Sequence, residues 1–411
     1  MDTAHEILLG TGLLLILAIM AGMFSARMGT PLLLAFLGIG MLAGEDGPGH
    51  IQFDDYRTAY LVGSLAMAII LFEGGLATRQ SMIRQALWPS LTLATLGVAI
   101  STGLMGTAIV WLFGVSWPSA LLLGAVISPT DAAAVGVQLR LSKAQVPSRL
   151  ISALEIESGL NDPMSVFLTL ALVEILIAPT QSGLGRMALL FIREMGGGVI
   201  LGLAGGFALL GALRLLKTEH VILPIFALGG CLLLFGGAQV LGASGFMAVY
   251  LAGIVIGNTV HPATVSIVRF FETLGWLAQI SLFLILGLLV TPHALVPLIL
   301  PALATAGIMI FIARPAATFA CLTPFRWKAR ESAFVSWVGL RGAVPIFLTI
   351  IPVLEGMQNG ETLFSVVYVI VLVSVAIQGS TIVPMARLLR LKNDDDSTTK
   401  IDENQQSAPA H

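Results

Sequence analysis

The segment RLISALEIESGLNDPMSVFLTLALVEILIA, residues 149–178, combines a long apolar run with carboxylates near its middle. A helix needs about 20 mostly apolar residues to cross the hydrocarbon layer of a bilayer, so this segment is long enough to span one. A charged side chain deep in such a span costs about 2.5–3.5 kcal/mol on insertion scales, and it usually has a function. The segment therefore predicts a membrane helix with a polar site inside it.

Composition extends this interpretation to the whole chain. Of its 411 residues, 56% are hydrophobic and only 11% are charged, and the mean hydropathy is +0.94. A soluble domain carries about 25% charged residues, which cover its surface. We therefore expect an all-α integral membrane protein. The net charge of -2 gives no reason to expect nucleic acid as a partner.

Thirteen apolar stretches are candidate transmembrane helices: residues 6–26, 30–44, 57–76, 86–114, 117–137, 149–178, 186–216, 221–241, 242–258, 269–290, 294–322, 330–354 and 361–389. Basic residues gather in alternate loops and after the last span, and acidic residues dominate the opposite loops. Because positive charge is typical of cytoplasmic loops, this pattern places the N-terminus outside and the C-terminus in the cytoplasm. We expect residues 1–390 to form one transmembrane domain and residues 391–411 a disordered cytoplasmic tail.

Charged side chains inside the predicted spans each need an explanation. They are Glu73, Asp131, Glu155, Glu157, Asp162, Glu174, Arg193, Arg314 and Arg341. Glu73 and Glu174 lie near the ends of their spans, where we expect them to be solvated at the membrane interface. Arg193 is close enough to the interface to extend its side chain there. The other charges concentrate at three places.

The densest group is Glu155-Ile156-Glu157-Ser158-Gly159-Leu160-Asn161-Asp162-Pro163 in the sixth span. Residues four apart share a helix face, so Glu157 lies one turn from Asn161, and Ser158 lies one turn from Asp162. A buried polar brace explains Glu157 and Asn161. It does not explain Asp162, which we interpret as a functional carboxylate.

The second group of polar residues lies at a predicted helix break. In Ser128-Pro129-Thr130-Asp131 of the fifth span, Pro129 lacks an N–H and clashes with the carbonyl four residues earlier, so the helix should break there. Irregular backbone occurs at membrane depth where it lines a cavity or packs against protein. Freed carbonyls, Thr130 and Asp131 would then converge near mid-depth.

Gly339-Leu340-Arg341-Gly342-Ala343-Val344-Pro345 weakens the twelfth span in the same way, around a cation. The two breaks correspond if spans 1–6 and 8–13 form two inverted six-helix repeats, an arrangement that places transport sites at the repeat interface. Either Arg314 of the eleventh span or Arg341 can neutralise Glu157, and the sequence does not choose between them. Such a buried pair would hold Asn161 and Asp162 in place rather than add net stability.

Together these residues predict a binding site for an alkali cation. Asp162 and Asp131, with the hydroxyl oxygens of Thr130 and Ser158, offer hard oxygen ligands. Because desolvation disfavours an ionised carboxylate, a proton competes with the cation for the same group. If the site faces the two sides of the membrane in turn, a cation is exchanged for a proton, and the two carboxylates titrate jointly.

Four motifs, in this order, resemble those of the monovalent cation:proton antiporters of the sodium/proton exchanger type: SPTDAAAV (128–135), ESGLNDP (157–163), ASGFMAVYLAG (243–253) and GLRGAVP (339–345). The resemblance covers nearly the whole membrane region. It implies a homodimer in a bacterial inner membrane, with a core that moves like an elevator, no enzymatic activity and no cofactor. By position, it implies that Asp162 carries the ion and the proton, that Asp131, Thr130 and Ser158 line its site, and that Glu157, Asn161 and Arg314 or Arg341 support it.

The resemblance also bears on stoichiometry and branch. The pair Asn161-Asp162 resembles the residue pair of the electroneutral branch of these antiporters, whereas an Asp-Asp pair is typical of the electrogenic branch. We therefore predict that one cation is exchanged for one proton. EIESG with NDPM (155–164) and SWVGLRGAVP (336–345) are similar to the NhaP-type bacterial potassium/proton antiporters. Members of that branch often carry a cytosolic regulatory domain after the last span, for which this sequence ends too soon, so regulation of that kind is an open question. Potassium and sodium also stay open, because both bind to the same oxygens.

Two other classes of protein compete with this interpretation. Gly242-Ala243-Ser244-Gly245 fits the short GxSG pattern of rhomboid-like intramembrane serine proteases, but these need a membrane-buried histidine as base. All six histidines lie at the edges of apolar runs, in loops or at the termini. A cation channel would favour a continuous polar pore with rings of charge. Paired broken helices around one compact site favour a carrier.

Overall fold

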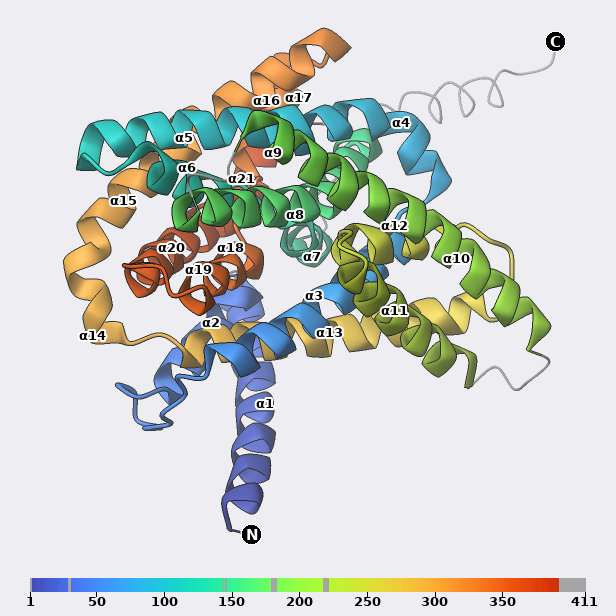
Figure 1. The fold of residues 1–411 in the computed structure, drawn as a ribbon, viewed down its shortest axis with the longest axis horizontal. Coiled ribbons are helices and arrows are strands. Elements are labelled where there is room, and N and C mark those ends of the chain that lie inside the picture. The colour runs from blue at the N-terminus through green and yellow to red at the C-terminus, as the bar shows by residue number, and fades with distance from the viewer. Residues whose placement is uncertain are drawn as a thin grey trace, which may run out of the picture.

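A computed structural model describes residues 2–28, 31–142, 144, 146–178, 183–216 and 222–391. All regular secondary structure in these residues is helical, as predicted (Figure 1). The predicted tail lies outside the described residues, apart from Leu391.

The helices of the N-terminal half are α1 (Asp2–Met28), α2 (Leu32–Ala43), α3 (Tyr56–Ala77), α4 (Gln80–Thr92), α5 (Val98–Phe113), α6 (Trp117–Val126), α7 (Ala132–Ser142) and α8 (Ser148–Ile177). Those that follow are α9 (Leu184–Phe191), α10 (Gly197–Leu215), α11 (Ile222–Val240), α12 (Gly245–Gly257), α13 (Thr264–Leu288), α14 (Pro292–Leu295), α15 (Ile299–Ile308), α16 (Arg314–Leu322), α17 (Ala329–Trp337), α18 (Ala343–Leu348), α19 (Ile350–Leu354), α20 (Gly360–Ser374) and α21 (Ser380–Leu388). Single π-helical turns join α4 to α5, α9 to α10, α15 to α16 and α20 to α21, so each pair continues as one long helical segment.

Many of these segments are long enough to cross a bilayer. Within the described ranges, nine are long and apolar enough to do so, and shorter apolar helices lie at Leu32–Ala43, Trp117–Val126, Gly245–Gly257 and Ala343–Leu354. The break between α11 and α12 lies after Val240, close to the predicted boundary. The chain is therefore a multi-pass helical membrane protein.

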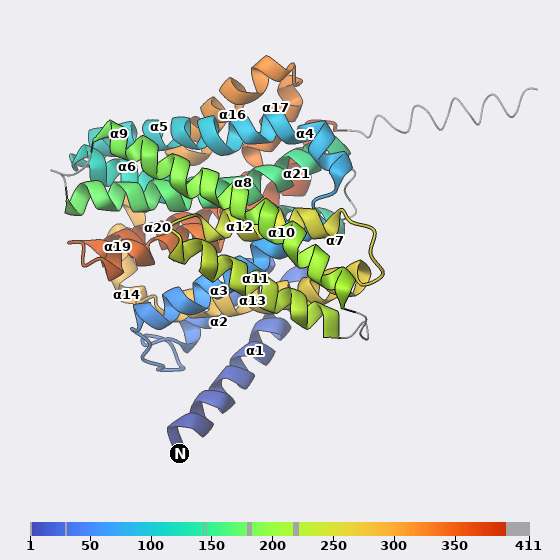
Figure 2. The same ribbon diagram turned by 45° about the vertical axis from the view of Figure 1, so that its right-hand side comes forward.

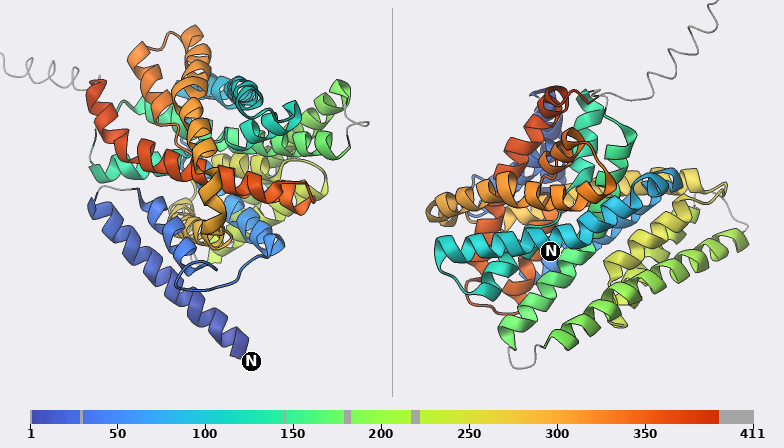
Figure 3. Two further views of the ribbon diagram at one scale, coloured as in Figure 1. Left: turned by 90° about the vertical axis from the view of Figure 1, so that its left-hand side faces the viewer. Right: turned by 90° about the horizontal axis from the view of Figure 1, so that it is seen from above.

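Most of the helices pack into two groups. In the first, which we call the panel (α2, α3 and α10–α13), α3 packs along α12 and α13, α2 along α13, and α10 along α12. In the second, the core bundle (α4–α8 and α14–α21), α8 packs against α4 and α6, α5 against α6, and α15 against α20. Figure 3 shows α10 and α11 at the opposite edge from α15 and α20. Helix α1 packs on α2 and extends away from both groups (Figure 2).

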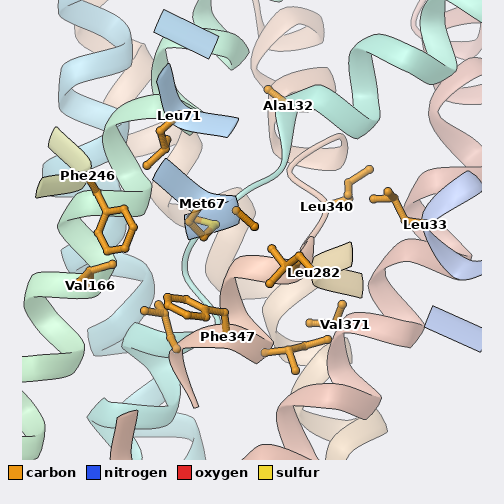
Figure 4. Close-up of a cluster of buried hydrophobic side chains, with 14 of the residues drawn as sticks. Leu33, Met67, Leu71, Ala132, Val166, Phe246, Leu282, Leu340, Phe347 and Val371 are labelled. Atoms are coloured by element: carbon orange, nitrogen blue, oxygen red, sulfur yellow. The ribbon is translucent and has the colours of Figure 1, made fainter. Parts of the chain in front are cut away.

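Contacts inside the panel differ from those between the panel and the core bundle. A Cβ at Gly75 of α3 would collide with the Tyr250 carbonyl of α12, and one at Gly253 would collide with the backbone of α3, so these two backbones touch. Between the two groups, apolar side chains meet near the middle of the molecule: the Phe347 ring of α18 stacks on Tyr60 of α3 with centroids 5.5 Å apart. Met67, Phe246 and Leu282 of the panel gather near Phe347 (Figure 4). The panel is thus a tightly joined unit that meets the core bundle across an apolar face.

Candidate ion-binding site

Both predicted helix breaks are present, and they meet. Helix α6 ends at Val126 and α7 begins at Ala132, on either side of Pro129. Helix α17 ends at Trp337 and α18 begins at Ala343. The Asp131 backbone N–H donates to the Leu340 carbonyl at 2.9 Å, so the two irregular segments are hydrogen-bonded to each other.

Arg341 occupies the crossing of these segments. Its Nη1 donates to the carbonyl oxygens of Ser128 at 2.7 Å and Pro129 at 3.0 Å, and only 1% of the residue is exposed. Its backbone N–H donates to Ser374 Oγ at 2.9 Å. The guanidinium therefore supplies donors to carbonyls that lost their helical partners at the break.

Helix α8 holds the break between α6 and α7 through its polar face. Ser158 Oγ donates to the Thr130 carbonyl at 2.8 Å and accepts from the Ala132 N–H at 3.3 Å. One turn further on, Asn161 Nδ2 donates to Thr130 Oγ1 at 2.8 Å. Residues predicted to share faces of the sixth span thus contact the fifth span.

The carboxylates of Asp131 and Asp162 line one cavity of about 190 Å³. Thr130 and Ser158 line it too, so the structure brings together all four residues predicted to bind the cation. Asp131 Oδ1 accepts from the Ala134 N–H at 3.0 Å, at the start of α7. Asp162 lines the cavity although only 6% of the residue is exposed, and its Oδ1 is buried without a hydrogen-bond partner among the described residues.

The open question of the Glu157 partner is settled by distance. Arg314 Nη1 lies 2.6 Å from Glu157 Oε1, and both side chains are almost completely buried. Arg341 instead contacts the backbone of the break. Since Glu157 and Asn161 are one turn apart on α8, the ion pair anchors the helix face that holds Thr130.

Some residues that line the cavity were not predicted. Glu73, which we expected at the membrane interface, forms part of the cavity wall with Glu155 and Arg140, because α3 lines the cavity from Met67 to Ala77. Its position beside Gly74-Gly75 inside an apolar span was a signal that could have identified it. Tyr250 of α12 also lines the cavity; it lies within the motif at residues 243–253, but no role in the site was predicted for it.

The other intramembrane charges and the GxSG serine have structural partners. Glu174 pairs with Arg186 at 2.6 Å, and both side chains are partly exposed, as expected for the end of a span. Arg193 Nη2 donates to the Leu241 carbonyl at 3.1 Å. Ser244 precedes α12 and its Oγ accepts from the Met247 N–H at 3.3 Å, so it is a helix cap rather than a nucleophile.

Gly342 determines where the Asp131 carboxylate can lie, because a Cβ at position 342 would overlap it. We expect Gly342→Ala to lower the exchange rate about tenfold, since overpacking of this kind costs about 1–3 kcal/mol. Exchange by purified protein in liposomes measures the effect. Gly103→Ala in α5 is the matched control, because a Cβ there meets nothing within 4 Å. A wild-type rate for Gly342→Ala would show that Asp131 tolerates displacement.

Discontinuous helices that meet around carboxylates inside a helical membrane protein are typical of secondary transporters. The sequence model described as "Sodium/hydrogen exchanger, transmembrane" matches residues 13–388, so the chain belongs to the sodium/hydrogen exchanger family. It is thus an antiporter that exchanges a cation for protons, not an enzyme, and exchange of this kind needs no cofactor.

Individual relatives agree with this assignment. The chain is 43% identical to the K(+)/H(+) antiporter NhaP2 of Shewanella sp. (strain ANA-3) over 393 residues. These residues are 95% of this chain and 68% of the relative. It is also 43% identical to the K(+)/H(+) antiporter NhaP of Alkalimonas amylolytica, over 95% of this chain and 68% of that relative. It is 30% identical to the Na(+)/H(+) antiporter NhaP of Pseudomonas aeruginosa, over 77% of this chain and 78% of that relative.

The fold is also that of a solved antiporter. The sodium proton antiporter MjNhaP1 from Methanocaldococcus jannaschii at pH 8 superimposes with a TM-score of 0.82 at 22% identity, covering 95% of this chain and 99% of that one.

Proposed function

We propose that Asp162 binds the transported cation and the proton in alternation, and that Asp131, Thr130 and Ser158 complete the cation site. The observation that carries this proposal is the single cavity that Asp162 and Asp131 share at the crossing of the two broken helices. Placing two carboxylates in one desolvated cavity disfavours the doubly ionised state, so occupancy by a cation or by a proton relieves the same repulsion. Competition between the two ligands then couples their movements in opposite directions.

In this proposal the Glu157–Arg314 pair, Asn161 and Arg341 form the supporting network. Asn161 contacts Thr130, and Arg341 holds the carbonyls next to it. Binding sites of transporters need ligands that stay in place while the site changes sides. We assign this network that role, without direct contact with the ion.

We also propose the architecture of the working transporter. The nine long segments and four shorter helices would give thirteen spans, with spans 1–6 and 8–13 as inverted repeats and residues 1–390 as one transmembrane domain. The membrane would be a bacterial inner membrane, with the N-terminus outside and the C-terminus cytoplasmic. This orientation follows from the distribution of Lys and Arg between the loops.

Two copies would associate as a homodimer, and the core bundle would move like an elevator against the panel. The apolar contact around Phe347 supports such a movement, because hydrophobic contact is not directional and can re-form after sliding. Inside the panel, by contrast, the backbones of α3 and α12 touch at Gly75 and leave no room to slide.

The exchange should be electroneutral, and potassium is the first cation to test, since the relatives at 43% identity are named K(+)/H(+) antiporters. Liposomes containing the protein and a pH gradient are given potassium, sodium or choline chloride, and dissipation of the gradient is followed at zero and 100 mV. A net charge would be driven by about 2.3 kcal/mol per 100 mV, so the end point would shift roughly 50-fold. We expect no shift.

Each result of this experiment has a distinct meaning. Dissipation by potassium or sodium but not choline, unchanged by voltage, supports the proposal. A rate or an end point that responds to voltage contradicts one-for-one exchange. Failure of both alkali cations to dissipate the gradient contradicts antiport of these ions.

A further inference from the structure

The chain passes from the panel into the core bundle at two described connections. One joins α3 to α4 through Thr78 and Arg79, and the other joins α13 to α14 through residues 289–291. In each case a helix of the core bundle begins with backbone N–H groups that have no partner within the helix. The residue just before such a helix normally supplies a side-chain oxygen as a cap.

At the start of α4 the cap comes from the panel. Arg79 precedes the helix, and its side chain carries only donors, so it cannot accept from these N–H groups. Asn258, which follows α12, accepts from the Gln80 N–H through Oδ1 at 2.6 Å. Its Nδ2 donates to the Thr78 carbonyl at 2.8 Å, at the end of α3. One amide group therefore binds both ends of the connection.

The start of α14 repeats this arrangement on a different loop. Thr291 precedes the helix and makes no side-chain cap. Asp46, in the loop after α2, accepts from the His293 N–H at 2.9 Å, and the same Oδ2 lies 2.6 Å from His293 Nδ1. The hydrogen bond from the His293 backbone N–H is the main cause that lowers the pKa of the Asp46 carboxyl below its ordinary value. The carboxylate is thus an acceptor throughout the neutral pH range.

We propose that Asn258 and Asp46 are positioning residues that fix the two pivots on which the core bundle turns against the panel. This inference rests on the alternating movement proposed above. A helix that is capped by the panel keeps its first turn in place while its far end moves with the core bundle. Loss of a cap lets the first turn fray, so the movement of the ion site is no longer tied to a fixed point.

The test at the first pivot compares Asn258→Ala, Asn258→Asp and Thr259→Val. We expect Asn258→Ala to reduce the maximal exchange rate about tenfold, in line with the loss of a helix cap, with KM for the cation unchanged. Asn258→Asp keeps the acceptor for Gln80 but loses the donor to the Thr78 carbonyl, so it should recover only part of the rate. Thr259→Val is the matched control: Thr259 follows Asn258 after α12, and its Oγ1 donates to the Val255 carbonyl of α12 at 2.8 Å rather than to α3 or α4.

The second pivot is tested with Asp46→Ala and its neighbour Glu45→Ala. Asp46→Ala should slow exchange several-fold, whereas Glu45→Ala, which removes a carboxylate from the same loop, should leave the rate unchanged. Asp46→Asn retains an acceptor oxygen, so its exchange rate should lie between those of Asp46→Ala and Glu45→Ala.

A structural readout separates this proposal from the proposed function. Amide hydrogen exchange of the first turn of α4 should rise at least about tenfold in Asn258→Ala and not in Thr259→Val. Equal protection in the two variants, equal rates, or a change confined to KM would overturn the pivot assignment. The wild-type protein could transport no cation while Asn258→Ala still shows faster amide hydrogen exchange than Thr259→Val. That result would count against the proposed function alone.

Discussion

Asp162→Asn should reduce cation:proton exchange to the level of liposomes without protein. An amide neither ionises near neutral pH nor offers a charge to a cation, so both proposed ligands lose their site. Asp162 Oδ1 is buried without a hydrogen-bond partner among the residues that the structure describes, and an unpaired buried carboxylate is costly. We therefore expect the thermal stability of the variant in detergent to equal or exceed that of the wild type.

The control for this experiment is Glu174→Gln on the same helix. It also converts a carboxylate to an amide, but Glu174 pairs with Arg186 outside the cavity, and exchange should persist. Measured exchange by Asp162→Asn above the protein-free rate would refute the role assigned to Asp162. A folded, inactive variant together with an active Glu174→Gln would support it.

The largest effect on stability is expected from Arg314→Met. The Arg314–Glu157 pair has exposed side-chain fractions of 4% and 1%, so the substitution leaves Glu157 as an uncompensated buried charge. Breaking such a pair from one side costs about 3–5 kcal/mol, and the yield and melting temperature of the folded protein should fall steeply. Adding Glu157→Gln removes the unpaired charge and should restore most of the lost stability.

A double-mutant cycle tests whether the pair is a brace or a participant in transport. We expect the combination of Arg314→Met and Glu157→Gln to be stable and to exchange ions at a measurable rate. A stable but inactive double variant would contradict the supporting role. Arg341→Met with Glu157→Gln is the control. Arg341 binds the carbonyls of Ser128 and Pro129, so removal of the Glu157 charge should not restore the stability that Arg341→Met loses.

Much of the site could be predicted because its parts are local in sequence. Pro129 breaks a helix through its own ring, wherever the helix packs, and Asp131 follows within two residues. The period of the helix places Ser158 with Asp162 and Glu157 with Asn161 on adjacent faces of one helix, and these faces meet Thr130 and the start of α7 in the structure.

Residues that join the site from distant helices could not be predicted in this way. Arg314 and Arg341 are both cations in apolar spans, and only the packing of α16 against the remaining core bundle brings Arg314 to Glu157. Glu73 reaches the cavity because α3 lies beside it. Asn258 meets Gln80 across 178 positions of sequence, in a contact that no motif records.

By itself, the sequence determined that this protein is a helical membrane protein with two interrupted helices and carboxylates next to the interruptions. The cost of exposing backbone or charge to lipid leaves few other folds for such a chain. Tertiary structure decided which arginine neutralises Glu157, which panel residues line the cavity and which side chains cap the helices of the core bundle. Those pairings depend on distances between segments far apart in the chain, and close packing, rather than local periodicity, sets such distances.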